Sequence, residues 1–136
     1  KNRPERIELE IESMEAKVIG DVNQLRFLLE NLIDEALTVR EDGVIRLQAR
    51  KDNEYIRFLF TDTRREKSVE ELNQLFYPNL ARMTSGEKGE LRGTEYLICK
   101  QIIRDHDEFA GRRGCRINAE PAEGGGFTVY FTIPRR

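Results

Sequence analysis

The residues of this chain that are best suited to hold a charged ligand lie in its last third. Gly93 precedes residues 94–103, where apolar side chains recur at helical spacing. A glycine at a helix start leaves backbone N–H groups and the helix dipole available to a phosphate. Glu95 stands at the same helix start, where a carboxylate stabilises the helix by about 0.3–1 kcal/mol and competes for these N–H groups. The pattern therefore indicates a phosphate site, a glycine needed only for packing, or an anion site that the chain fills itself.

Four further polar residues are candidates for a site, and each also has a structural explanation. Asn31 and Glu35 lie four residues apart, on one face of a predicted helix. Asn31 is equally consistent with a buried helix residue that bonds a neighbouring strand. Asp62 ends a predicted strand, where aspartate commonly serves a turn. His106 lies in the acidic run 105–108, but no second histidine or cysteine has metal-ligand spacing, so we expect a structural role for it.

Composition narrows the range of partners. The chain has 23 Lys and Arg against 25 Asp and Glu, so its net charge of -2 gives no strong attraction to nucleic acid or to an anionic membrane. We therefore expect no nucleic acid partner and no direct membrane contact, and no apolar run reaches membrane-spanning length. Cys99 and Cys115 lack metal or redox spacing. They are predicted to be reduced, buried thiols in a reducing, cytoplasmic compartment.

The spacing of apolar residues, together with capping and turn residues, predicts the helices and strands that must position these candidates. Alternating apolar residues indicate five strands, and apolar residues at helical spacing indicate three helices. Asp21 is a good N-cap for the longest helix, and Ser68 begins a capping box. The predicted strands are 7–11, 45–49, 56–60, 115–119 and 127–133, and the predicted helices are 22–38, 68–77 and 94–109. Residues 79–92 are predicted to form a mobile loop, and the glycine triplet 124–126 a hairpin turn.

These elements predict an α/β (α+β) fold. We expect a two-layer sandwich, with a mixed, mostly antiparallel sheet and about three helices on one face. The 136 residues suit one domain, which spans 1–136. Because the chain begins at Lys1 without methionine, we expect it to be the C-terminal fragment of a larger protein.

Four blocks in this order resemble the ATP-binding (HATPase, GHKL-type) domain of sensor histidine kinases. Residues 21–36 resemble the Asn-Leu-x-x-Asn-Ala motif of the family's first helix. Residues 60–63 resemble the strand that leads into its Asp-x-Gly-x-Gly motif. Residues 71–78 resemble the short helix before the ATP lid. Residues 93–103, with the final hairpin, resemble the second glycine box, so the resemblance covers almost the whole chain.

The resemblance implies ATP and Mg²⁺ as cofactors and assigns roles to four residues. Asn31 and Glu35 occupy the positions of two asparagines that hold the magnesium ion, and a carboxylate is an acceptable Mg²⁺ ligand. Asp62 matches the aspartate that accepts a hydrogen bond from the adenine amino group, and Gly93 matches a glycine of the second box. No catalytic residue is expected on the chain itself. The phosphoacceptor histidine belongs on a helical dimerisation domain of the same protein, and a response regulator is a candidate partner.

The chain departs from the family pattern at several positions. Glu35 replaces the second asparagine, Thr38 replaces a lysine, and the altered glycine positions carry Arg64, Glu66, Leu91 and Glu95. Side chains at 64 and 66 either clash with a bound ring or fill its place. Two functions follow: the ATP-binding, catalytic-type domain of a two-component sensor histidine kinase-like protein, or a pseudokinase-like module that has lost ATP use and acts through protein contacts. An unrelated α/β binding domain is a third alternative.

Overall fold

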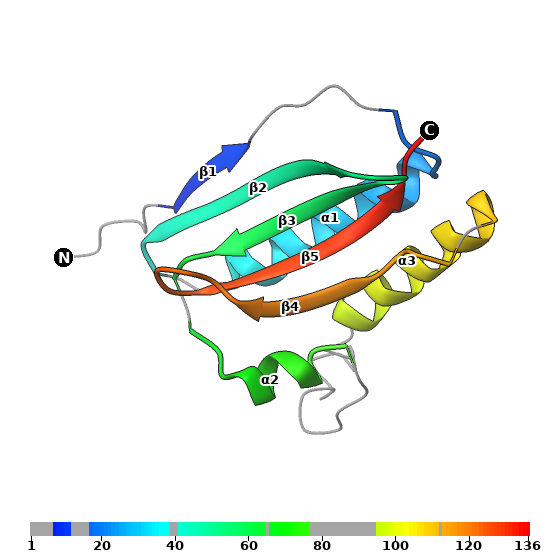
Figure 1. Ribbon diagram of the computed structural model, residues 1–136. Coiled ribbons are helices and arrows are strands. Elements are labelled where there is room, and N and C mark those ends of the chain that lie inside the picture. Colours follow the sequence, from blue (N-terminus) through cyan, green and yellow to red (C-terminus); the bar gives the residue numbers. More distant parts are fainter. Residues whose placement is uncertain (1–6, 12–16, 39–40, 65, 77–94, 112) are drawn as a thin grey trace, which may run out of the picture.

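A computed structural model describes residues 7–11, 17–38, 41–64, 66–76, 95–111 and 113–136 (Figure 1). It contains a five-stranded sheet in the order β1-β2-β3-β5-β4, in which β1 and β2 are parallel and the other neighbours are antiparallel. The strands are β1 (Ile7–Ile11), β2 (Gly43–Asp52), β3 (Tyr55–Asp62), β4 (Ile117–Pro121) and β5 (Phe127–Pro134). The helices are α1 (Val22–Leu37), α2 (Val69–Gln74) and α3 (Glu95–Ala110).

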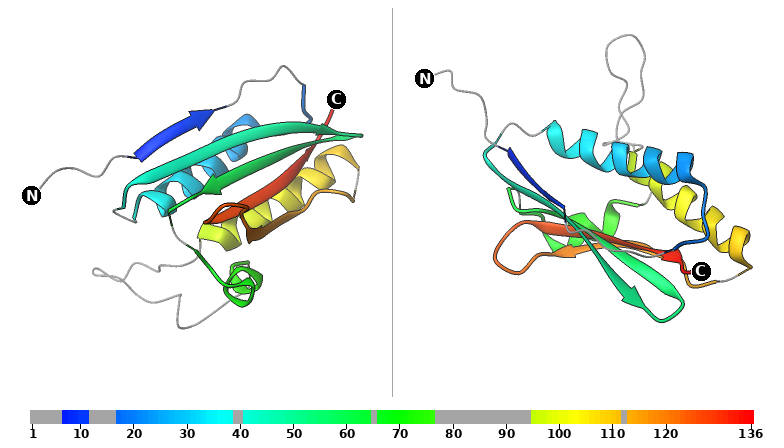
Figure 2. Two further views of the ribbon diagram at one scale, coloured as in Figure 1. Left: turned by 60° about the vertical axis from the view of Figure 1, so that its left-hand side comes forward. Right: turned by 90° about the horizontal axis from the view of Figure 1, so that it is seen from above.

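The elements form two layers, as predicted. Helices α1 and α3 lie side by side over one face of the sheet, and the short α2 lies beside the edge strand β4 (Figures 1 and 2). The mixed, mostly antiparallel sheet with helices on one face confirms the predicted fold class. No helix in the described part of the chain is long and apolar enough to cross a membrane.

One hydrophobic core fills the space between the two layers. Each fully buried aliphatic or aromatic side chain contributes about 1.5–3 kcal/mol relative to leaving it in water. The rings of Phe58 and Phe131 stack across β3 and β5, with 5.1 Å between their centroids. The buried residues include Leu28, Leu32 and Ala36 of α1, Tyr96, Cys99, Ile102 and Ile103 of α3, and Phe127, Val129, Phe131 and Ile133 of β5.

Most helix and strand ends lie within two residues of their predicted positions. Asp21 caps α1 by accepting from two backbone N–H groups, and Ser68 forms the predicted capping box of α2. The glycine triplet has φ of 87°, 116° and 82°, which confirms the predicted turn. Strand β4 begins at Ile117, two residues later than predicted, because the N–H of Cys115 donates to Asp107 at 2.8 Å instead of to the sheet. The predicted loop 79–92 lies outside the described residues.

Candidate functional site

Asp62 ends β3, the central strand of the sheet, and its side chain is buried. The residue pairs with Ile45 on β2 and with Phe127 on β5, and it is 1% exposed. Its backbone is closely approached by the hairpin turn, because a Cβ atom on Gly126 would lie 2.0 Å from the carbonyl oxygen of Asp62. A glycine at 126 therefore lets the β4–β5 hairpin close against the end of β3.

The carboxylate of Asp62 is held by Arg64, two residues further along the chain. The Nε atom of Arg64 donates to Oδ1 of Asp62 and its Nη2 atom donates to Oδ2, each at 2.9 Å. The backbone N–H of Arg64 adds a third bond to Oδ1 at 3.0 Å. The side chains of Arg64 and Asp62 are 0% and 1% exposed. The hydrogen bond to Asp62 is the main cause that raises the pKa of the Arg64 guanidinium above its ordinary value, so the group stays a cation.

Arg64 also joins this strand end to α1 and to β2. Its Nη2 atom donates to the carbonyl oxygen of Ala36 in the last turn of α1, where a cation is favourable for the helix dipole. Its Nη1 atom lies 3.5 Å from the carbonyl oxygen of Glu41. Its stem lies against Gly43, where a Cβ atom would be 2.2 Å from the Cγ of Arg64. The Arg64 side chain thus fills the space between three elements.

The two predicted magnesium ligands lie one helical turn apart on the neighbouring stretch of α1. The Nδ2 atom of Asn31 is buried, and no hydrogen-bond partner for it is found among the described residues. Glu35 directly precedes Ala36, the residue whose carbonyl Arg64 contacts. Glu35 therefore lies at the end of α1 that packs beside the Arg64–Asp62 pair. The hydroxyl of Thr38, which replaces the family lysine, donates to the carbonyl of Glu35 at 2.7 Å and caps the helix.

The two ends of the expected nucleotide site differ in how well they suit Mg-ATP. At the α1 end, the buried Nδ2 atom of Asn31, which has no partner among the described residues, can still donate to a phosphate or metal-bound group, and Glu35 supplies an oxygen ligand. These residues fit. At the β3 end, Arg64 bonds both carboxylate oxygens of Asp62. That arrangement does not fit an adenine amino group, which needs the same carboxylate as its acceptor.

Two predicted features of the second glycine box stay predictions. Gly93 lies outside the described residues, so its role at the helix start is not tested. Helix α3 begins at Glu95, close to the predicted start at 94, but the side chain of Glu95 is likewise outside the described part of the structure. The hypothesis that this carboxylate replaces a phosphate is unchanged.

The structure confirms a structural role for His106. The side chain is fully buried at the end of α3, where its Nδ1 atom donates to the carbonyl of Ile102 at 2.8 Å. Its Nε2 atom accepts from the backbone N–H of Asp21, the N-cap of α1, at 3.2 Å. The imidazole therefore joins the end of one helix to the start of the other.

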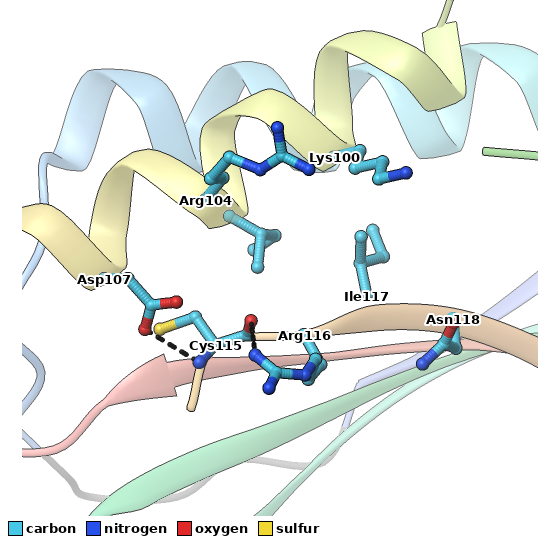
Figure 3. Close-up of a pocket in the computed structure, with 8 residues that line it drawn as sticks. Lys100, Arg104, Asp107, Cys115, Arg116, Ile117 and Asn118 are labelled. Atoms are coloured by element: carbon cyan, nitrogen blue, oxygen red, sulfur yellow. Dashed lines mark hydrogen bonds between the residues drawn. The ribbon is translucent and has the colours of Figure 1, made fainter. Parts of the chain in front are cut away.

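Sequence analysis did not predict a pocket between α3 and β4. It has a volume of about 310 Å³ and is lined by Lys100, Ile103, Arg104, Asp107, Cys115, Arg116, Ile117 and Asn118. Figure 3 shows Lys100 and Arg104 on the helix side and Arg116 and Asn118 on the strand side. The carboxylate of Asp107 bonds the Cys115 backbone, and Arg116 bonds two nearby carbonyl groups. The only sequence signal was the spacing of Lys100 and Arg104, four residues apart on one helix face.

Comparisons with known proteins agree with this geometry. No curated protein sequence matches the chain. Among solved structures, the nucleotide-free catalytic domain of the histidine kinase ThkA has a TM-score of 0.71 at 23% identity, covering 96% of this chain and 78% of that one. The mycobacterial sensor histidine kinase MprB has a TM-score of 0.72 at 20% identity, covering 96% and 83%. ThkA in complex with the response regulator TrrA has a TM-score of 0.68 at 22% identity, covering 96% and 34%.

These likenesses show that the fold is that of histidine kinase catalytic domains. The sequence itself matches a family model over residues 20–136, which include both α1 and the strand end that carries Asp62. Because that match spans most of the chain, the chain belongs to the family of histidine kinase-, DNA gyrase B- and HSP90-like ATPases.

Proposed function

We propose that this chain is the ATP-binding, catalytic-type domain of a two-component sensor histidine kinase-like protein, and that residues 1–136 form one domain of that larger protein. The observation that carries the proposal is the position of Asp62. It lies buried at the end of the central strand, beside the last turn of the helix that bears Asn31 and Glu35. In this family the same strand end and helix hold the base and the metal-bound phosphates.

Asn31 and Glu35 are the residues that would hold Mg²⁺. The amide of Asn31 and the carboxylate of Glu35 lie on one face of α1, and both are oxygen donors of the kind that Mg²⁺ prefers. Mg-ATP would supply the phosphoryl group, and the protein would contribute positioning and charge stabilisation. Since Glu35 carries a charge that asparagine lacks, phosphate binding here should depend strongly on the metal.

The acceptor of that phosphoryl group would lie elsewhere in the parent protein. The single histidine of this chain, His106, is fully buried and bonded between two helices, so it is not placed to accept a phosphoryl group. We infer a helical dimerisation and phosphoacceptor domain as the main partner, in the cytoplasm, with a response regulator as a further partner. The complex of ThkA with a response regulator is consistent with that inference.

A pseudokinase-like module is the second candidate function. The ion pair of Arg64 and Asp62 is the specific observation in its favour, because it withdraws the base-binding carboxylate from a ligand. In that case the domain would act through protein contacts alone.

Calorimetric titration of Mg-ATP into the folded chain tests the proposal. We expect saturable binding that weakens by about tenfold or more without Mg²⁺ and in Asn31→Ala, because α1 then loses a metal contact. Glu35→Asn, which restores the family residue, should retain binding. Glu30→Gln, on an exposed part of the same helix, is the matched control and should bind as the wild type does. Absence of binding at millimolar Mg-ATP would instead favour the pseudokinase candidate.

A further inference from the structure

We propose that Arg64 is an internal occupant of the base end of the nucleotide site. Its guanidinium holds the carboxylate of Asp62 and keeps it from accepting a hydrogen bond from an adenine amino group. The inference rests on the proposed function and deepens it, since it concerns how the same site treats its ligand. It predicts a site that binds the phosphate end of a nucleotide without selecting its base.

The hydrogen bonds of Asp62 support this occupancy. Oδ1 accepts from the backbone N–H and from Nε of Arg64, and Oδ2 accepts from Nη2. A bidentate pair of opposite charges is stronger than a bond from a neutral donor to the same carboxylate. The amino group of a purine is one neutral donor, so it does not displace the guanidinium without a large cost. With both side chains shielded from solvent, that cost includes leaving a buried charge without its partner.

The guanidinium is also turned toward the protein and not toward a ligand. Its Nε and Nη2 atoms bond Asp62, Nη2 also bonds the carbonyl of Ala36, and Nη1 faces the carbonyl of Glu41. The whole side chain is 0% exposed. Arg64 is therefore not a new base-reading residue that offers its donors to a guanine. Its side chain instead occupies the base end of the site.

The surrounding backbone is shaped to accept this side chain. Gly43 begins β2 with φ of +154°, and a Cβ atom there would lie 2.2 Å from Cγ and 3.0 Å from Cδ of Arg64. Thr63, which lies between Asp62 and Arg64, is bonded to Val44 of β2. Its N–H donates to the carbonyl of Val44 at 3.0 Å, and its hydroxyl accepts from the N–H of Val44 at 3.1 Å. Only a residue without a side chain leaves room at 43 for the Arg64 stem.

The occupancy has two measurable consequences. If Arg64 leaves Asp62 in only a small fraction of molecules, the apparent dissociation constant for ATP rises by the inverse of that fraction, so about 1% open molecules raises it about 100-fold. Base selectivity is lost as well. ITP carries a carbonyl group where ATP carries the amino group, so the wild type should bind ATP and ITP with similar affinity.

Calorimetric titration of Mg-ATP and Mg-ITP into the wild type and Arg64→Gly tests the inference. The glycine restores the family residue and frees Asp62. We expect Arg64→Gly to bind ATP about tenfold or more tightly than the wild type does, and to prefer ATP over ITP by about tenfold or more. The matched control is Arg57→Ala, which removes a second arginine–aspartate pair, one that joins β3 to Asp52 of β2 and is partly exposed. It should leave both affinities unchanged.

Several results would overturn the inference. A wild-type preference for ATP over ITP of about tenfold would mean that Asp62 reads the base with Arg64 present, and would leave the proposed function intact. A folded Arg64→Gly protein with no gain in ATP affinity would also overturn it. If circular dichroism shows that the glycine variant is unfolded, Arg64→Met replaces it, because methionine keeps much of the stem against Gly43 and has no donor for Asp62. Wild-type behaviour of that variant would overturn the inference. Binding of neither nucleotide by any protein would refute the proposed function as well.

Discussion

The guanidinium of Arg64 and the carboxylate of Asp62 meet through two hydrogen bonds of 2.9 Å, and neither side chain is exposed to solvent. This pair lies where the central strand β3, the end of α1 and the start of β2 come together. The pair of Arg57 on β3 and Asp52 at the end of β2 differs, because its side chains are 46% and 42% exposed. The two pairs allow a direct comparison of a buried and an exposed ion pair in one protein.

We expect Arg64→Ala to lower the free energy of unfolding by about 3–5 kcal/mol, because it leaves the buried carboxylate of Asp62 without its partner. Arg57→Ala should lower it by about 1 kcal/mol or less, since an exposed pair is screened by water. Urea denaturation followed by circular dichroism measures both values. Equal losses would show that Asp62 gains enough water in the absence of Arg64 to replace the pair.

Two glycines of the same turn should respond differently to alanine. Gly126→Ala should prevent the hairpin from closing, because its Cβ atom would lie 2.0 Å from the carbonyl oxygen of Asp62. At Gly124 nothing lies within 4 Å of a built Cβ, so Gly124→Ala costs only the strain of a φ of 87°, about 1–2 kcal/mol. Thermal denaturation of the two variants checks this order. A milder effect at 126 than at 124 would contradict the close approach to Asp62.

His106→Ala should lower the free energy of unfolding by about 2–4 kcal/mol. It opens a cavity at a fully buried site, and it removes the acceptor of the Asp21 N–H and the second donor to the carbonyl of Ile102. Arg104→Ala, at an exposed position of the same helix, should change it by about 0.5 kcal/mol or less. Urea denaturation of both proteins gives the comparison, and a loss at His106 no larger than that at Arg104 would exclude the proposed joint between α1 and α3.

The start of α1 should depend on the side chain of Asp21. Its Oδ1 atom accepts from the backbone N–H groups of Asn23 and Gln24, at 2.9 and 3.1 Å. We expect Asp21→Ala to cost about 1 kcal/mol, and Asp21→Ser to cost much less because serine also accepts as an N-cap. Chemical denaturation measures both. Equal losses would indicate that the charge of Asp21, and not its capping bond, is what stabilises the helix.

Element identity was predictable because it depends on neighbours in the sequence. The alternation of Ile56, Phe58 and Phe60 places one face of β3 in the core, and the spacing of Leu28 and Leu32 does the same for α1. Capping residues then set where helices begin. The start of β4 was misplaced by two residues because the bond between Cys115 and Asp107 joins the strand to α3, and periodicity carries no information about such a contact.

Sequence by itself determined the order of the elements, the fold class and the position of Asp62 at the end of a strand, because periodicity, caps and turn residues act over a few positions. It also showed that Arg64 stands where the family has glycine, and left open whether that side chain would clash with a ring or fill its place. Only the tertiary structure decided the outcome. Arg64 is held against Asp62 by a hydrogen bond to the carbonyl of Ala36 and by the room that Gly43 leaves for its stem. Ala36 and Gly43 are remote from Arg64 in the sequence and meet it only when α1 and β2 pack against β3.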